Sequence, residues 1–173
     1  FPSGAPGSGF NVFKAKEGGG IKVGVANVNG RVFMEPLECP FRTTIQAVQE
    51  LYKETNIIIV DIHAEATSEK VALGWYLDGK VSAVLGTHTH IQTADERLLP
   101  KGSAYITDAG MTGPYDSVIG RRVEDVLERF LTSIPIRFEV AQGNVQLHGV
   151  VMDIDENTGK AISIARIQRK LNV

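Results

Sequence analysis

Cysteine is almost absent from the chain. A single residue, Cys39, occurs among 173, so no internal disulfide can form and the residue has no CxxC partner. Cys39 stands directly before Pro40. A buried or half-buried thiol is the simpler interpretation of this residue, although a Cys-His hydrolase with Cys39 as nucleophile stays open.

The chain also lacks an excess of charge and any long apolar run. Its 18 Lys and Arg residues nearly balance 20 Asp and Glu residues, which gives a net charge of −2 with no basic cluster. This excludes the positive surface typical of proteins that bind duplex nucleic acid or anionic membranes. No signal-like or membrane-length apolar segment occurs in the sequence, so a reducing cytoplasmic location is expected.

What is present is an ordinary globular composition, with 43% hydrophobic and 22% charged residues. A chain of 173 residues can build one domain with a sizeable core, and no repeat or low-complexity linker divides it. We therefore expect residues 1–173 to form a single domain. Because the chain starts at Phe1 inside the loop-like FPSGAPGSG, we also expect it to be part of something longer.

Strand-like and helix-like patterns alternate along the first two thirds of the chain. Strands are expected at 21–28, at 56–61 leading into Ile62 and His63, at 82–86 and at 104–107. The first helix should begin at Pro40 and bury Phe41, Ile45, Val48 and Tyr52. The second should begin near Thr67 and Ser68, end at Asp78-Gly79 and bury Val71, Ala72, Trp75 and Tyr76.

The last third has a different pattern. A further helix is expected to bury Val123, Val126, Leu127, Phe130 and Leu131. Three successive strands should follow at about 136–142, 144–154 and 161–169. Glycine and asparagine in their connections suit hairpin turns, so these strands are interpreted as an antiparallel meander. Together the patterns predict an α/β or α+β layered fold with mixed strand directions.

Three of the four histidines stand at the ends of strand-like segments. His63 closes the run IIIVDIH, and His88 and His90 flank Thr89 in GTHTH. In an extended segment residues i and i+2 project to one side, so His88 and His90 can converge with His63 at the carboxyl ends of neighbouring strands. Three imidazoles predict a site for a divalent transition metal. Carboxylates that could hold the imidazole N–H groups are Asp61, Asp95 and Asp108.

Two further features allow a functional and a structural interpretation. The loop at 108–117, DAGMTGPYDS, could place the hydroxyls of Thr112, Tyr115 or Ser117 against a ligand, or could be a tight surface turn. The fourth histidine, His148 in VQLHGVV, is interpreted as a hydrogen-bonded residue on a strand surface.

Long blocks of the chain resemble a known family. VANVNGR (25–31), VDIHAEATSEK and GTHTHIQTAD within 60–120, and GVVMDID (149–155) are similar to the YmdB-type metallophosphoesterases of bacteria. The resemblance implies a calcineurin-like sandwich of mixed β-sheets flanked by helices. It also implies two metal ions, often iron or manganese, and hydrolysis of phosphodiesters including 2′,3′-cyclic nucleotides. By the same resemblance, His63 and His88 are ligands of one ion and His90 is a ligand of the other.

The family's opening blocks are missing from this sequence. They contribute an aspartate ligand, a bridging Glu beside an Asn, and an Asn-His pair whose His protonates the leaving oxygen. We therefore expect the catalytic acid to lie outside residues 1–173, so that this chain alone binds at most one metal weakly and turns over little substrate. An uncovered sheet edge should favour self-association, including homo-oligomers.

Two alternatives stay open at this point. One is a mononuclear zinc hydrolase whose three histidine ligands, His63, His88 and His90, are all within the chain. The other is a non-catalytic regulatory or binding module that keeps the fold and holds a protein partner. The first should retain one tight zinc ion, and the second should tolerate the loss of His88.

Overall fold

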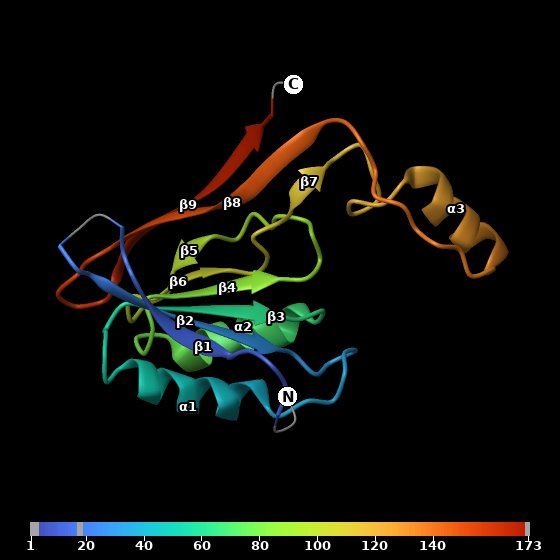
Figure 1. Ribbon diagram of the computed structural model, residues 1–173. Coiled ribbons are helices and arrows are strands. Elements are labelled where there is room, and N and C mark those ends of the chain that lie inside the picture. The colour runs from blue at the N-terminus through green and yellow to red at the C-terminus, as the bar shows by residue number, and fades with distance from the viewer. Residues whose placement is uncertain (1–3, 17–18, 172–173) are drawn as a thin grey trace.

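The computed structural model describes residues 4–16 and 19–171 (Figure 1). Strands and helices alternate through most of the chain, as the sequence predicts. The elements are β1 (Phe10–Lys14), β2 (Lys22–Asn29), α1 (Pro40–Leu51), β3 (Ile58–His63), α2 (Thr67–Leu77), β4 (Ala83–Thr87), β5 (Arg97–Leu98), β6 (Ala104–Ile106), β7 (Thr112–Pro114), α3 (Val123–Thr132), β8 (Val145–Ile154) and β9 (Ala161–Lys170).

A six-stranded sheet forms the centre of the molecule, in the order β1-β2-β3-β4-β6-β5. Its four inner strands are parallel, and β1 and β5 pair antiparallel at the two edges. Parallel neighbours need a crossover connection. Helices α1 and α2 supply the β2–β3 and β3–β4 crossovers and cover one face of the sheet (Figure 1).

The second sheet, β7-β8-β9, lies over the opposite face of the central sheet. Met152 of β8 and Ile164 of β9 pack against Ala83 and Ala104, whose small side chains let the two sheets approach. The layers are therefore helices, mixed sheet and antiparallel sheet. This confirms the predicted α/β layered fold with mixed strand directions.

The side chains of β3 alternate strictly between the two faces. Ile58, Val60 and Ile62 have no exposed surface and join the core beneath the helices. Asp61 and His63 point to the other face and are only half-buried. The same alternation that buries the apolar side chains therefore places Asp61 and His63 together at the carboxyl edge of the sheet.

The predicted inner face of α2 is wrong. Trp75 and Tyr76 are 52% and 43% exposed, and the buried positions include Leu73, Gly74 and Leu77 instead. At Gly74 an added Cβ would collide with the ring of Tyr105, so the helix approaches the sheet through its glycine. Ala72 is exposed as well, whereas Val71 is partly buried against the core.

Two other predicted helix faces are only partly correct. In α1 Val48 is buried and Phe41 and Ile45 pack partly on the core, but the C-cap residue Tyr52 is 47% exposed. In α3 Val126 is the single buried residue, and the other expected core residues, Val123, Leu127, Phe130 and Leu131, are exposed. The hydroxyls proposed as caps of α2 make no capping bond, because the cap position is Ala66.

The strand expected at 136–142 does not form. This segment makes a single isolated bridge, Arg121 to Val140, and the edge of β8 that it would occupy is paired with β7. The hairpin of β8 and β9 is confirmed as antiparallel. No helix within 4–16 and 19–171 has the length and apolar character needed to cross a membrane.

Replacing Gly86 with alanine tests how closely β4 approaches the chain beyond β6. A Cβ at this buried glycine would overlap the backbone carbonyl of Thr107, which cannot move aside easily. We expect Gly86→Ala to lower the free energy of unfolding by about 3 kcal/mol, measured by urea denaturation of the full-length protein. The control is Gly113→Ala, because no heavy atom lies within 4 Å of its added Cβ. Equal losses in both variants would contradict this close approach.

Candidate metal centre

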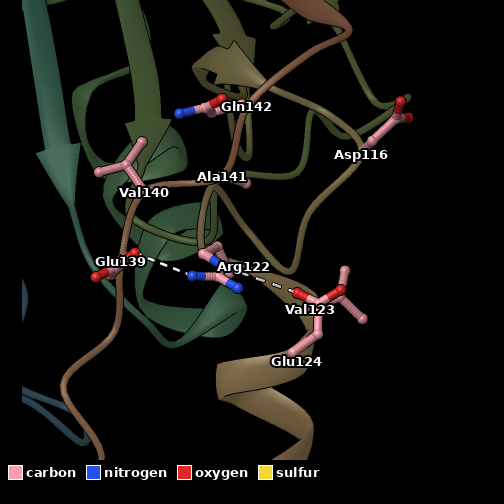
Figure 2. Close-up of a pocket in the computed structure, with 8 residues that line it drawn as sticks. All are labelled: Asp116, Arg122, Val123, Glu124, Glu139, Val140, Ala141 and Gln142. Carbon is pink, nitrogen blue, oxygen red and sulfur yellow. Dashed lines mark hydrogen bonds and ion pairs between the residues drawn. The ribbon is translucent and has the colours of Figure 1, made fainter.

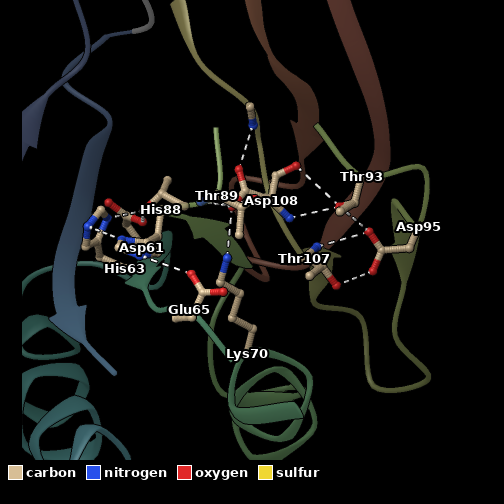
Figure 3. A network of polar contacts seen from close by, with 12 residues as sticks. Asp61, His63, Glu65, Lys70, His88, Thr89, Thr93, Asp95, Thr107 and Asp108 are labelled. Atoms are coloured by element: carbon tan, nitrogen blue, oxygen red, sulfur yellow. Dashed lines mark hydrogen bonds and ion pairs between the residues drawn. The ribbon is translucent and has the colours of Figure 1, made fainter. Parts of the chain in front are cut away.

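His63 and His88 meet at the carboxyl edge of the central sheet (Figure 3). His63 ends β3 and is in register with Thr87, which ends the neighbouring parallel strand β4 and precedes His88. Nε2 of His63 lies 3.1 Å from Nδ1 of His88, and the two rings are nearly perpendicular at 86°. Adjacent strand ends therefore bring together two residues that are 25 positions apart in the sequence.

A chain of hydrogen bonds fixes the proton of His63. The Thr87 hydroxyl donates to Asp61 Oδ1 at 2.8 Å, and Asn27 donates to the other carboxylate oxygen at 2.7 Å. Since an ionised carboxylate only accepts, the Thr87 oxygen is left to accept from Nδ1–H of His63, 3.0 Å away. The lone pair of His63 is thereby placed on Nε2, which faces His88.

The pKa of His63 is lowered, first by burial and then by the neighbouring His88. Burial disfavours the charged imidazolium form, and a second imidazolium close by disfavours it further. His63 is therefore neutral at pH 7 and able to act as a metal ligand.

Glu65 orients the second ring. Its Oε2 lies 3.2 Å from Nε2 of His88, and a carboxylate at this distance favours a proton on that nitrogen. In the tautomer with its proton on Nε2, His88 presents the lone pair of Nδ1 toward the lone pair of His63. Two lone pairs at 3.1 Å repel unless a proton or a cation lies between them.

The pair has the spacing of two ligands of one transition metal. Imidazole nitrogens bind zinc at about 2.0–2.1 Å, so two ligands at octahedral or tetrahedral angles are ~2.8–3.4 Å apart. The observed 3.1 Å lies within that range. Both outer nitrogens face acceptors, the Thr87 hydroxyl and the Glu65 carboxylate, as the N–H groups of metal-bound histidines almost always do. The residues present therefore fit a metal ion.

His90 lies apart from this pair. Its Nδ1–H donates to the backbone carbonyl of Ile119 at 2.9 Å, which leaves Nε2 with the lone pair. In the described part of the chain no hydrogen bond or ring contact joins His90 to His63 or His88, and no three His, Cys, Asp or Glu residues are arranged to hold one ion.

The expected extended geometry through Thr89 is wrong. His88 and His90 have φ angles of 112° and 67°, outside the strand region, so the i and i+2 side chains diverge. His88 turns toward His63, and His90 turns toward Ile119. Ile119 is itself a β-branched residue with a φ of 47°. Such strained residues gather at functional sites when the surroundings hold them in place.

In the described part of the chain, no hydrogen bond joins any of the three predicted carboxylates to a histidine ring. Asp61 acts through Thr87, and Asp108 accepts from Lys70 and Thr89. Asp95 accepts hydrogen bonds from Thr93 and Thr107. Burial alone would raise the pKa of Asp95, but these hydrogen bonds outweigh it and the pKa is lowered.

Sequence reasoning missed Glu65, the carboxylate that reaches a ring. Its signal was its position two residues after His63, at the same end of β3. It also missed that Thr87 would connect Asp61 to His63. That connection depends on the register of β3 against β4, which places His63 beside Thr87.

Some side chains of the loop at 108–117 already make contacts within the protein. Thr112 begins the short strand β7 and is exposed, and the Tyr115 hydroxyl donates to the Met111 carbonyl at 3.1 Å. The Tyr115 ring packs on His148 with centroids 4.2 Å apart. His148 lies on β8, as expected, with Nε2 3.2 Å from Gln146. Substrate contacts of Thr112 and Tyr115 stay a prediction.

Two other candidate sites have no link to the histidine pair. Cys39 is at the start of α1, where the backbone N–H of Arg42 lowers its pKa, but among the described residues its thiol makes no hydrogen bond to a histidine. A cavity of about 450 Å³ lies beside α3 (Figure 2). Its Arg122 is paired with Glu139 at 3.0 Å, which holds the start of α3 against residues 139–141.

A family model for YmdB-like proteins matches residues 1–167 of the chain. The chain belongs to this family. The resemblance inferred from the sequence is thereby confirmed. This family member is 54% identical over 167 residues to the 2′,3′-cyclic-nucleotide 2′-phosphodiesterase of Bacillus subtilis (strain 168), an alignment that covers 96% of this chain and 62% of that protein.

Solved structures of similar proteins share the fold of this family member. A hypothetical protein from Thermus thermophilus has a TM-score of 0.87 at 45% identity, covering 98% of this chain and 65% of that one. A novel phosphatase from Mycoplasma pneumoniae has a TM-score of 0.86 at 38% identity, covering 98% and 60%. The chain thus spans less than two thirds of the length of these relatives.

Replacing Thr87 tests the hydrogen-bond chain behind His63. Thr87→Val keeps the shape of the side chain but removes the hydroxyl that accepts from Nδ1–H, so the ring loses its fixed orientation. We expect the affinity of the full-length protein for Mn²⁺, measured by calorimetry, to fall by about 10–100-fold. Thr87→Ser keeps the hydroxyl and should restore the affinity. Equal affinities in the valine variant and the wild type would show that Asp61 and Thr87 do not orient His63.

Proposed function

We propose that the full-length protein is a metal-dependent phosphodiesterase that hydrolyses 2′,3′-cyclic nucleotides. The observation that supports this most strongly is the close approach of His63 Nε2 and His88 Nδ1, which are 3.1 Å apart. The curated relative named for this activity is the source of the substrate assignment.

His63 and His88 would hold one ion, and His90 would offer its free Nε2 to a second. Iron suits imidazole ligands of this kind, and manganese suits carboxylate ligands such as a shared anionic bridge would supply. When bound, the ions would supply Lewis-acid polarisation of the phosphate oxygens. Each ring would keep its proton on the nitrogen that faces away from the ion. For His63 the acceptor is Thr87, backed by Asp61; for His88 it is Glu65, and for His90 it is the carbonyl of Ile119.

The chain's own residues would bind and orient the substrate beside these rings. The loop that carries Thr112 and Tyr115 also leads to Ile119, whose carbonyl holds His90. We propose that this loop contacts the nucleotide. A neutral His63 ring at pH 7 suits metal binding beside this loop, because burial lowers the pKa of His63.

Residues 1–173 alone are proposed to turn over little substrate. A two-metal phosphodiester site needs an anionic ligand shared by the ions and an acid for the leaving oxygen. Within 4–16 and 19–171 no third His, Cys, Asp or Glu joins the pair as a ligand of one ion, and Glu65 lies against the outer nitrogen of His88. The complete activity is therefore assigned to the full-length protein.

The test is hydrolysis of 2′,3′-cyclic AMP by the full-length protein loaded with Mn²⁺ or Fe²⁺. Cleavage of the bond between phosphorus and O2′ should give adenosine 3′-phosphate, which chromatography separates from the 2′-phosphate. A chelator should abolish the reaction, and added metal should restore it. Undiminished hydrolysis after the metal has been removed, or no hydrolysis by the loaded protein, would overturn the proposal.

A mononuclear zinc hydrolase within this chain is the second candidate. It needs His90 beside His63 and His88, whereas His90 is bonded to Ile119 instead. One tightly bound zinc ion and measurable hydrolysis by residues 1–173 alone would favour it. A non-catalytic module would instead keep its protein partner after His88→Ala.

A further inference from the structure

A buried ion pair lies directly behind the turn that carries His88 and His90. Lys70 of α2 and Asp108, which follows β6, are 2.9 Å apart, and each side chain is 1% exposed. A buried charge is costly unless it is paired and fully hydrogen-bonded. The fold therefore keeps an energetically costly ion pair at this position, and Figure 3 shows the pair beside the two histidines.

The carboxylate of Asp108 holds Thr89 by two bonds. Its Oδ2 accepts from the backbone N–H of Thr89 at 3.0 Å and from the hydroxyl of Thr89 at 2.7 Å, in addition to Lys70. Its Oδ1 accepts from the N–H of Gly110 at 2.9 Å. Thr89 is thus fixed at both its backbone and its side chain by a group that has no freedom to move.

The two hydrogen bonds between Asp108 and Thr89 explain the unusual backbone conformation of His88 and His90. His88 and His90 both have positive φ, and each such residue costs on the order of 1–3 kcal/mol unless its surroundings compensate. Charge-assisted hydrogen bonds to the residue between them supply that compensation. The strained turn sends His88 toward His63 and His90 toward Ile119.

We propose that Asp108, paired with Lys70, is a positioning residue that holds Thr89 and so divides His88 and His90 between two metal ions. This inference rests on the proposed two-metal function. In an extended segment the two rings would lie on the same side and compete for one position. The Lys70, Asp108 and Thr89 network separates them without touching a ring nitrogen.

The test uses Mn²⁺ alone as the probe and the metal-free full-length protein. Thr89→Val removes one of the two bonds to Asp108 and leaves the buried ion pair intact. We expect its affinity for at least one of two Mn²⁺ ions to fall by about 10–100-fold in calorimetric titrations, while Thr89→Ser restores it. Thr89→Ala removes the same hydroxyl and gives the same comparison if the valine variant does not fold.

Thr55→Val is the matched control. Its hydroxyl donates to the Lys22 carbonyl at 2.7 Å, at the amino end of β3 and away from the histidines. Unchanged Mn²⁺ affinity in Thr89→Val, or an equal loss in Thr55→Val, would overturn the positioning role. If the wild type binds no Mn²⁺, the proposed function itself fails. If the wild type and Thr89→Val both bind two ions with equal affinity, the proposed function stands and only the positioning role fails.

Discussion

His88→Ala in the full-length protein is expected to lower kcat for 2′,3′-cyclic AMP on the order of 10³-fold. The substitution leaves Nε2 of His63 without the nitrogen that faces it at 3.1 Å, so an ion held between them would lose one of its ligands. Transition-state stabilisation of several kcal/mol is at stake, and each ~1.4 kcal/mol is a tenfold change in rate. The measurement is steady-state hydrolysis together with metal content by elemental analysis.

His148→Ala is the matched control for the metal content. His148 lies on β8, where Nε2 contacts Gln146 and the ring packs on Tyr115, so its loss should leave the bound metal unchanged. If His88→Ala retained the wild-type metal content and rate, the histidine pair would not be the metal centre.

Lys70→Met is expected to cost about 3–5 kcal/mol of unfolding free energy. The substitution leaves the Asp108 carboxylate buried with its hydrogen bonds from Thr89 and Gly110 but without a counter-charge. Urea denaturation of the metal-free full-length protein measures the loss. The double variant Lys70→Met/Asp108→Asn removes both charges, so it should recover part of the stability.

Lys22→Met provides a control with the same geometry and different burial. Lys22 and Glu54 are also 2.9 Å apart, but their side chains are 39% and 55% exposed. Exposed pairs contribute about 0–1 kcal/mol, so this variant should be nearly as stable as the wild type. Similar losses in Lys70→Met and Lys22→Met would contradict the claim that burial makes the inner pair essential.

The strands that carry the site could be predicted because their signal is local. The β-branched run before His63 and the short apolar run before Gly86 give β3 and β4 directly. Parallel pairing then follows from the intervening helix α2. The proximity of His63 and His88 therefore follows from the order of the strands and helices along the chain.

The faces of α2 could not be predicted, because they depend on distant residues. Lys70 would normally be placed in solvent, yet it is buried by its pairing with Asp108, 38 residues further along the chain. Gly74 meets the ring of Tyr105, which lies on β6. Once these two positions face the sheet, Trp75 and Tyr76 are turned outward.

The backbone at the histidines and the pairing of β8 have a similar explanation. The alternation in GTHTH predicts rings on one side, but the bonds from Thr89 to Asp108 accompany a turn with positive φ. Residues 136–142 have strand-like composition, yet β7, a three-residue segment that ends in a proline, occupies the edge of β8. Both outcomes are decided by tertiary contacts.

The alternation of side chains along β3 has a consequence for how this protein can change. Because core residues and site residues occupy successive positions, an insertion or deletion of one residue would exchange the two sets, exposing isoleucines and burying Asp61 and His63. Sequence drift in this strand is therefore restricted to substitutions. New specificities would have to arise in the loops that follow the strands, where changes of length leave the registration of the sheet intact.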